Sequence, residues 1–220
     1  MAIRAVFFDV GETLIDETRH WSAWADEMGV PRFTFFAALG GVIARGQHHR
    51  KVFEVLDPTF DVAAAEARRR ARGIRYEFRE TDFYPDAIPC LTRLKRDGIV
   101  VGIAGNQPEG CENALSRAGV AADVLASSHA WGVEKPSAEF FHRIAASCGL
   151  PAREIAYVGD RVDNDISPAR AAGLFPVWIR RGPWAFLNQE AIAKSDAGAI
   201  IDTLDELPGA LAQDEAIRGV

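Results

Sequence analysis

Short apolar runs recur near the start of the chain and through its second half. They cover residues 3–8, 99–104 and 155–160 and are nearly continuous in apolar character. Such runs are typical of strands buried on both faces of a parallel sheet. Segments with helical spacing lie between them, as at Ile88, Leu91 and Leu94. This alternation predicts right-handed crossovers and an α/β core with a doubly wound, Rossmann-like parallel sheet.

A different pattern interrupts the chain after the first run. Trp21, Trp24, Ala25 and Met28 fall at i, i+3, i+4 and i+7, and further helical segments follow to about residue 80 without a strand between them. Several consecutive helices predict a separate bundle. We therefore expect an all-helical insertion at residues 16–82, within an α/β core formed by residues 1–15 and 83–220.

Composition and charge narrow the class of partner. The formal net charge is -6 and the sequence pI is about 5.4, which argues against a nucleic-acid or anionic membrane surface. We find no secretory signal pattern and no apolar run long enough for a membrane helix. Cys90, Cys111 and Cys148 form no C-x-x-C pair and are interpreted as reduced thiols. These features predict a cytoplasmic protein. They leave open whether it is a monomer or a homodimer.

Polar residues follow the apolar runs at positions where a ligand could bind. Asp9 ends the first run, Gly105 and Asn106 follow the run at 99–104, and Asp160 ends the run at 155–160. Parallel sheets of this type bind ligands beyond the carboxyl ends of their strands. We therefore expect these separate segments to converge on one edge of the sheet.

Four motifs, in order, resemble those of the haloacid dehalogenase-like hydrolase superfamily, whose members are mostly magnesium-dependent phosphatases. The motif D-x-D-x-T corresponds to "DVGET" at residues 9–13, and the Ser/Thr motif at the next strand end corresponds to "GN" at 105–106. The lysine motif corresponds to "KP" at 135–136, and G-D-x-x-x-N-D corresponds to "GDRVDND" at 159–165. The helical insertion resembles the cap domain of this family.

The resemblance implies hydrolysis of a small phosphorylated metabolite through an aspartyl-phosphate on Asp9. Asp9 and Asp160 would also bind Mg²⁺, together with the backbone carbonyl of Gly11, while Asp165 would act through water or orient the other ligands. Lys135 would hold Asp9 and the phosphate by its charge.

Phosphate oxygens, by the same resemblance, would be bound by backbone N–H groups near Gly105 and Asn106. Gly105 stands where the family has Ser or Thr, so one hydroxyl contact to phosphate is absent. This change would weaken binding of the substrate rather than abolish the reaction.

Gly11 stands where the family has a second aspartate, which protonates the leaving group. Loss of such a group typically lowers the rate by about 10²- to 10⁴-fold. The candidate substitutes are Glu12, for which we favour an exposed or capping role over a catalytic one, and His48 or His49 in the insertion. The two histidines are expected on different helix faces, which is poor geometry for a metal. A substrate with a good leaving group would need no acid.

Three alternatives to a phosphatase stay open at this point. A catalytically weakened or non-catalytic protein that binds phosphate or metal is favoured by Gly11 and Gly105. A 2-haloacid dehalogenase uses an aspartate nucleophile without a metal, so the intact motif at 159–165 argues against it. A phosphonate hydrolase would also lack the second aspartate and would take its proton donor from the cap.

Overall fold

The computed structural model describes residues 2–187 and 196–218. Contacts between residues divide the chain into two compact units. One, here called the core unit, comprises Met1–Asp16 and Phe78–Val220, and the other, the helical unit, comprises Glu17–Glu77. The boundary at Glu77–Phe78 falls a few residues before the boundary expected from the sequence.

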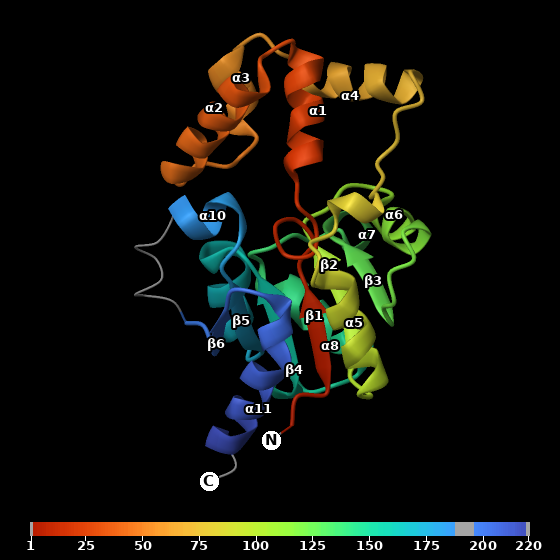
Figure 1. The fold of residues 1–220 in the computed structure, drawn as a ribbon, viewed down its shortest axis with the longest axis vertical. Helices are drawn as coiled ribbons and strands as arrows, with labels where there is room; N and C mark the ends of the chain where they lie inside the picture. Colours follow the sequence, from red (N-terminus) through yellow and green to blue (C-terminus); the bar gives the residue numbers. More distant parts are fainter. Residues whose placement is uncertain (1, 188–195, 219–220) are drawn as a thin grey trace. The chain divides into compact units, whose positions relative to one another are not determined.

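A parallel sheet of six strands forms the centre of the core unit (Figure 1). Its spatial order is β3-β2-β1-β4-β5-β6, and every neighbouring pair is parallel. This arrangement confirms the predicted doubly wound α/β fold. The strands are β1 (Ala5–Phe8), β2 (Val100–Gly105), β3 (Val124–Ser127), β4 (Ile155–Gly159), β5 (Phe175–Ile179) and β6 (Ala199–Ile201).

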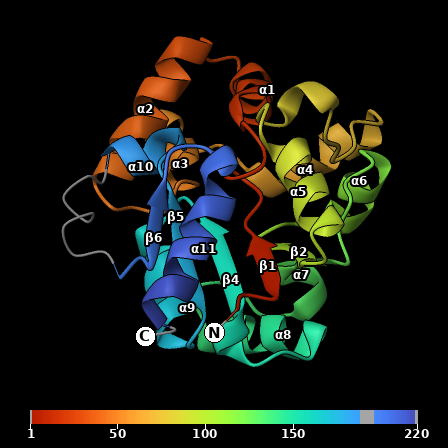
Figure 2. The ribbon, with the colours of Figure 1, turned by 60° about the horizontal axis from the view of Figure 1, so that its bottom comes forward.

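Helices cover both faces of the sheet. Helices α5 and α11 lie on one face, and α8 and α9 pack on the other (Figures 1 and 2). Further helical segments connect the strands. The helices of the core unit are α5 (Ala87–Arg96), α6 (Cys111–Arg117), α7 (Ser128–Trp131), α8 (Ala138–Cys148), α9 (Ser167–Ala171), α10 (Gly182–Leu187) and α11 (Leu207–Arg218). Short 3₁₀ and π segments are η1 (Glu80–Asp82), η2 (Ala152–Glu154), η3 (Val162–Ile166, a π-helix) and η5 (Leu204–Glu206).

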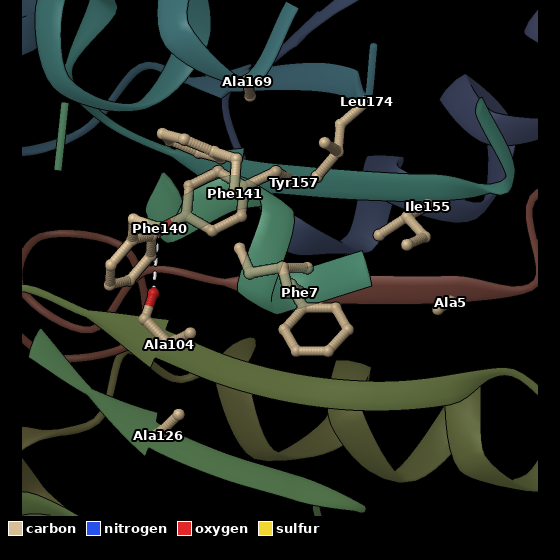
Figure 3. Close-up of a cluster of buried hydrophobic side chains, with 11 residues drawn as sticks. Ala5, Phe7, Ala104, Ala126, Phe140, Phe141, Ile155, Tyr157, Ala169 and Leu174 are labelled. Atoms are coloured by element: carbon tan, nitrogen blue, oxygen red, sulfur yellow. Dashed lines mark hydrogen bonds between the residues drawn. The ribbon is translucent and has the colours of Figure 1, made fainter. Parts of the chain in front are cut away.

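Aromatic side chains fill the layer between the sheet and α8 (Figure 3). Phe140 and Phe141 of α8 pack edge-to-face, with ring centroids 5.6 Å apart, and Phe141 packs on Tyr157 of β4 at 5.2 Å. Phe7 of β1 belongs to the same buried cluster. Burial of such rings contributes about 3–5 kcal/mol each, judged by truncation to alanine. This cluster supports the two central strands that lead into the polar edge of the sheet.

The helical unit contains α1 (Thr18–Met28), α2 (Arg32–Ala44), α3 (Lys51–Leu56) and α4 (Val62–Ala71). Its interior is aromatic, and Phe53 packs on Trp24 at 5.1 Å and on Phe35 at 6.2 Å between ring centroids. The expectation of helical segments to about residue 80 was wrong for residues 72–79, which have no helical structure. Gly73, with φ 77°, follows α4 and adopts the left-handed backbone that stops a helix.

Two antiparallel segments of the core unit flank the helical unit in the sequence. The Asp16 N–H donates to the carbonyl of Asp82 at 2.8 Å, and the Tyr84 N–H donates to the carbonyl of Leu14 at 3.0 Å. These hydrogen bonds hold the outgoing and returning chain together. None of the described helices combines the length and apolar character that a membrane crossing requires.

Candidate active site

Asp9 and Asp160 are brought together by neighbouring strands. Strands β1 and β4 pair in parallel with Phe8 opposite Val158, so the residues that follow them lie side by side. The Asp9 N–H donates to the carbonyl of Val158 at 2.9 Å, which extends the ladder by one residue. Both aspartate side chains are buried. The predicted convergence of the strand ends is therefore present at β1 and β4.

Asp165 reaches the same place from the π-helical segment η3. Gly159 makes this possible, because a Cβ on that residue would lie 2.4 Å from the Asp165 carboxyl carbon. One Asp165 oxygen, Oδ2, accepts the Arg161 N–H at 3.0 Å. Asp9, Asp160 and Asp165 each present an oxygen within 4.8 Å of the others.

Lys135 is the cation that lies among these carboxylates. Its side chain is fully buried, and Nζ lies 2.8 Å from Asp9 Oδ1 and 2.6 Å from Asp165 Oδ1. The Tyr157 ring lies against it, 5.4 Å from Nζ to the centroid. Burial alone would lower the pKa of Lys135, but the charges of Asp165 and Asp9 raise that pKa well above its usual value. Lys135 is therefore held as an ammonium ion.

One lysine does not neutralise three buried carboxylates. Burial, followed by the charges of Asp165 and Asp9, raises the pKa of Asp160 well above its usual value. Burial also raises the pKa of Asp165, to about 6, although Lys135 opposes this. Asp160 Oδ2 is buried and has no hydrogen-bond partner among the described residues. A buried, unsatisfied carboxylate oxygen beside two other carboxylates fits a divalent cation that prefers oxygen ligands, such as Mg²⁺.

Gly105 and Asn106 occupy the end of β2, beside this cluster. A Cβ on Gly105 would lie 2.4 Å from Asp9 Oδ1, so the present orientation of Asp9 uses the space that a larger residue would fill. The Asn106 side chain holds the main chain of Lys135, with its Oδ1 accepting the Lys135 N–H at 2.7 Å and its Nδ2 donating to the Lys135 carbonyl at 2.9 Å. Phosphate contacts by the backbone at Gly105 and Asn106, and metal binding by the carbonyl of Gly11, stay predictions.

Glu12 is not the exposed residue that the sequence suggested. It is 7% exposed, and its φ of 52° is a left-handed conformation uncommon outside glycine. Its Oε2 accepts a hydrogen bond of 2.6 Å from the hydroxyl of Tyr84. The Arg181 guanidinium lies 4.4 Å from the centroid of the Tyr84 ring and forms a bidentate ion pair with Asp86 at 3.0 and 2.6 Å. Sequence reasoning missed this network.

His48 and His49 belong to the helical unit and lie between α2 and α3. The expectation that they point to different faces of a helix was wrong, because they precede α3 and their rings stack, with centroids 4.3 Å apart and planes inclined by 29°. His49 also meets the Trp21 ring edge-to-face at 5.5 Å. A role for either histidine in the reaction stays a prediction.

Comparison with known proteins agrees with the motifs. Residues 3–173 match the family described as haloacid dehalogenase-like hydrolase. A glyceraldehyde 3-phosphate phosphatase of Methanopyrus kandleri is 31% identical over 213 residues, which cover 83% of this chain and 86% of the relative. A phosphoserine phosphatase of Thermus thermophilus is 30% identical over 141 residues, covering 62% of this chain and 56% of the relative.

The fold also has solved counterparts. A hydrolase of Bacillus subtilis, whose crystal structure was determined bound to magnesium, superposes with a TM-score of 0.70 and is 17% identical. The superposition covers 96% of this chain and 99% of that chain. At this identity the likeness concerns the fold.

Proposed function

This chain belongs to the haloacid dehalogenase-like hydrolase family, and on that premise we propose that it is a magnesium-dependent phosphatase of a small phosphorylated metabolite. The observation that carries the proposal is the buried cluster of Asp9, Asp160 and Asp165 around Lys135. The names of the curated relatives, which are phosphatases of small metabolites, support the class of substrate.

Asp9 is proposed as the nucleophile. Its carboxylate attacks phosphorus, the bond from phosphorus to the leaving oxygen breaks, and an aspartyl-phosphate forms on Asp9. Water then attacks the phosphorus of this intermediate, which releases inorganic phosphate and regenerates the carboxylate. Lys135 holds one Asp9 oxygen at 2.8 Å, so the nucleophile is fixed in orientation before the substrate arrives.

Asp9 and Asp160 are the residues that would bind Mg²⁺ directly, with the carbonyl of Gly11, and Asp165 would act through water. When bound, the ion neutralises charge on the phosphoryl group as it meets the carboxylate. Asp165 already uses one oxygen for Lys135 and the other for the Arg161 N–H, which suits an orienting role.

Gly11 has no side chain, so it cannot donate a proton to the leaving group. The Glu12 carboxylate accepts the Tyr84 hydroxyl, which makes Glu12 a structural anchor in our proposal and not the acid. We assign the helical unit the role of a cap that selects the substrate, and His48 or His49 is our candidate donor. A substrate with a good leaving group, such as an acyl phosphate, would proceed without one.

A non-catalytic protein that binds phosphate or metal is the second candidate, favoured by Gly11 and Gly105. A phosphonate hydrolase would require a proton donor from the cap, for which His48 and His49 are the candidates named above. A 2-haloacid dehalogenase has no use for a metal, and the unsatisfied Asp160 oxygen argues against it.

Turnover of an aryl phosphate, acetyl phosphate and glyceraldehyde 3-phosphate would test the proposal, with Mg²⁺ or with EDTA. The matched variants are Asp9→Asn and Asp97→Asn, which removes an exposed carboxylate of the core unit. We expect turnover that requires Mg²⁺, is lost in Asp9→Asn and persists in Asp97→Asn. Mg²⁺ binding without turnover of any substrate would favour the non-catalytic candidate.

A further inference from the structure

The side chain of Asn106 forms two hydrogen bonds to the main chain of Lys135. Its carboxamide accepts the Lys135 N–H at 2.7 Å and donates to the Lys135 carbonyl at 2.9 Å. These two residues are 29 positions apart, so the contact joins the end of β2 to the loop after α7. The Asn106 carboxamide thus bonds to both the N–H and the C=O of Lys135, as a residue of a neighbouring strand would.

This pairing requires an amide. The Asn106 carboxamide has a donor and an acceptor side by side, which match the N–H and C=O of one residue. An aspartate of the same shape would still accept the Lys135 N–H, but its second oxygen would face the Lys135 carbonyl without a proton between them. An alanine would leave both main-chain groups without this partner.

The clamped residue is the one whose ammonium lies in the carboxylate cluster. Lysine has a flexible stem of four carbons, so the placement of Nζ depends on where its Cα is held. Nζ lies 2.8 Å from Asp9 Oδ1 and 2.6 Å from Asp165 Oδ1, and the Tyr157 ring lies against it. The Tyr157 hydroxyl in turn donates to the carbonyl of Ala104 at 2.8 Å, two residues before Asn106. The end of β2 thus supports Lys135 at both its main chain and its ammonium.

We propose that Asn106 is a positioning residue for the hydrolytic reaction, acting through Lys135 and not through its own side-chain contact with phosphate. The inference rests on the proposed function, because it assigns Asn106 a part in the same site. The expected phosphate contacts of the backbone N–H groups near Asn106 stay a separate prediction. A displacement of about 1 Å in a group that orients the nucleophile can lower turnover by about 10²-fold.

Asn106→Asp and Asn106→Ala are the test variants, and Ser128→Ala is the matched control. Ser128 Oγ donates to the carbonyl of Gln107 at 3.3 Å, so the control removes one side-chain to main-chain hydrogen bond beside the same loop. We expect kcat to fall by about 10- to 100-fold in both Asn106 variants and by less than about twofold in Ser128→Ala. The isosteric Asn106→Asp serves if Asn106→Ala fails to fold.

Hydrogen exchange separates positioning from a general loss of stability. The Lys135 amide should exchange faster in Asn106→Ala, which removes its acceptor, than in the wild type, while the amides of β1 and β4 keep their protection. A double-mutant cycle with Lys135→Met then tests the route of the effect. If Asn106 acts through Lys135, adding Asn106→Ala to Lys135→Met should change the affinity for inorganic phosphate, measured with Mg²⁺, by less than about twofold.

Independent effects would overturn the proposal. If Asn106→Ala weakens phosphate binding by the same factor with and without Lys135, Asn106 contacts phosphate by itself. If both Asn106 variants turn over substrate like the wild type, Asn106 does not position Lys135 for the reaction. A wild-type protein without turnover of any phosphate ester would overturn the proposed function, whereas wild-type turnover that is insensitive to Asn106 overturns only the positioning role.

Discussion

The buried charged residues of the described chain lie in the core unit, whereas the charged residues of the helical unit are exposed or half-buried. In the core unit, Lys135, Asp160 and Asp165 are buried together at the edge of the sheet. In the described part of the helical unit, Ser22 is the one buried polar residue, and ion pairs such as Arg32–Asp26 are exposed. One unit thus has an aromatic interior, and the other combines a similar interior with a buried polar cluster.

This difference distinguishes residues that stabilise the fold from residues that serve the reaction. Removing a carboxylate or ammonium from water costs several kcal/mol per ion, and an apolar replacement is often as stable or more so. The helical unit shows that this chain can build an interior from apolar side chains such as Trp24, Phe35 and Phe53. The buried charges at the sheet edge are therefore explained better by the reaction than by folding.

Replacing Lys135 by methionine should have the largest effect. The change leaves Asp9 and Asp165 without their cation, and breaking a buried pair in this way costs about 3–5 kcal/mol. We expect that loss of unfolding free energy in denaturant titrations without metal, with part of it restored by Mg²⁺, and a fall in turnover of about 10³-fold or more. Lys95→Met, at an exposed lysine of the core unit, is the control. Equal effects of the two variants would contradict the comparison.

Phe35→Ala should destabilise the helical unit without changing the metal site. Phe35 is fully buried between Trp21 and Phe53, so its truncation should cost about 3–5 kcal/mol of local stability. Protection of the α1 and α2 amides should fall, while Mg²⁺ affinity, measured by calorimetry, stays within about twofold of the wild type. A large loss of Mg²⁺ affinity would show that metal binding depends on the stability of the helical unit.

Asp160→Asn should stabilise the metal-free protein at neutral pH. Burial raises the pKa of Asp160 in the folded state, so its ionised form opposes folding, and this penalty grows as pH rises above the unfolded value near 4. The stability advantage of Asp160→Asn over wild type should therefore increase from pH 4 to pH 7, by about 1.4 kcal/mol for each pKa unit of the shift. Saturating Mg²⁺ should remove the advantage. A difference that does not change with pH would contradict the assignment.

Asp61→Ala should have the smallest effect. Asp61 caps α4 in the helical unit, where its Oδ1 accepts the Ala64 N–H at 2.9 Å. Loss of such a cap costs about 1 kcal/mol. Thermal unfolding should show this small change, with turnover and Mg²⁺ affinity unaltered. A loss of turnover in Asp61→Ala would show that Asp61 does more than cap α4.

The fold was predictable because its signals are local. Buried strands such as β1 and β4 are short apolar runs, and their alternation with helices specifies the doubly wound topology. Local signals failed at residues 72–79, where the chain leaves the helical conformation after α4. The spatial order of the strands depends on long-range packing that no single segment encodes.

The site was predictable where a strand end defines it. Asp9 and Asp160 directly follow β1 and β4, so neighbouring strands bring them together. The burial of Glu12 could not be found in this way, since its partner Tyr84 is 72 positions away. The Asn106 clamp is likewise a contact between distant segments.

Trapping the covalent intermediate tests the central claim most directly. Wild-type protein would be mixed with acetyl phosphate and Mg²⁺, quenched in acid during turnover, and digested for mass spectrometry. We predict a phosphoryl group on Asp9 in the peptide that contains β1, absent from Asp9→Asn and from samples with EDTA. Turnover accompanied by an unmodified Asp9, or by a phosphoryl group on another residue, would contradict a mechanism built on this aspartate.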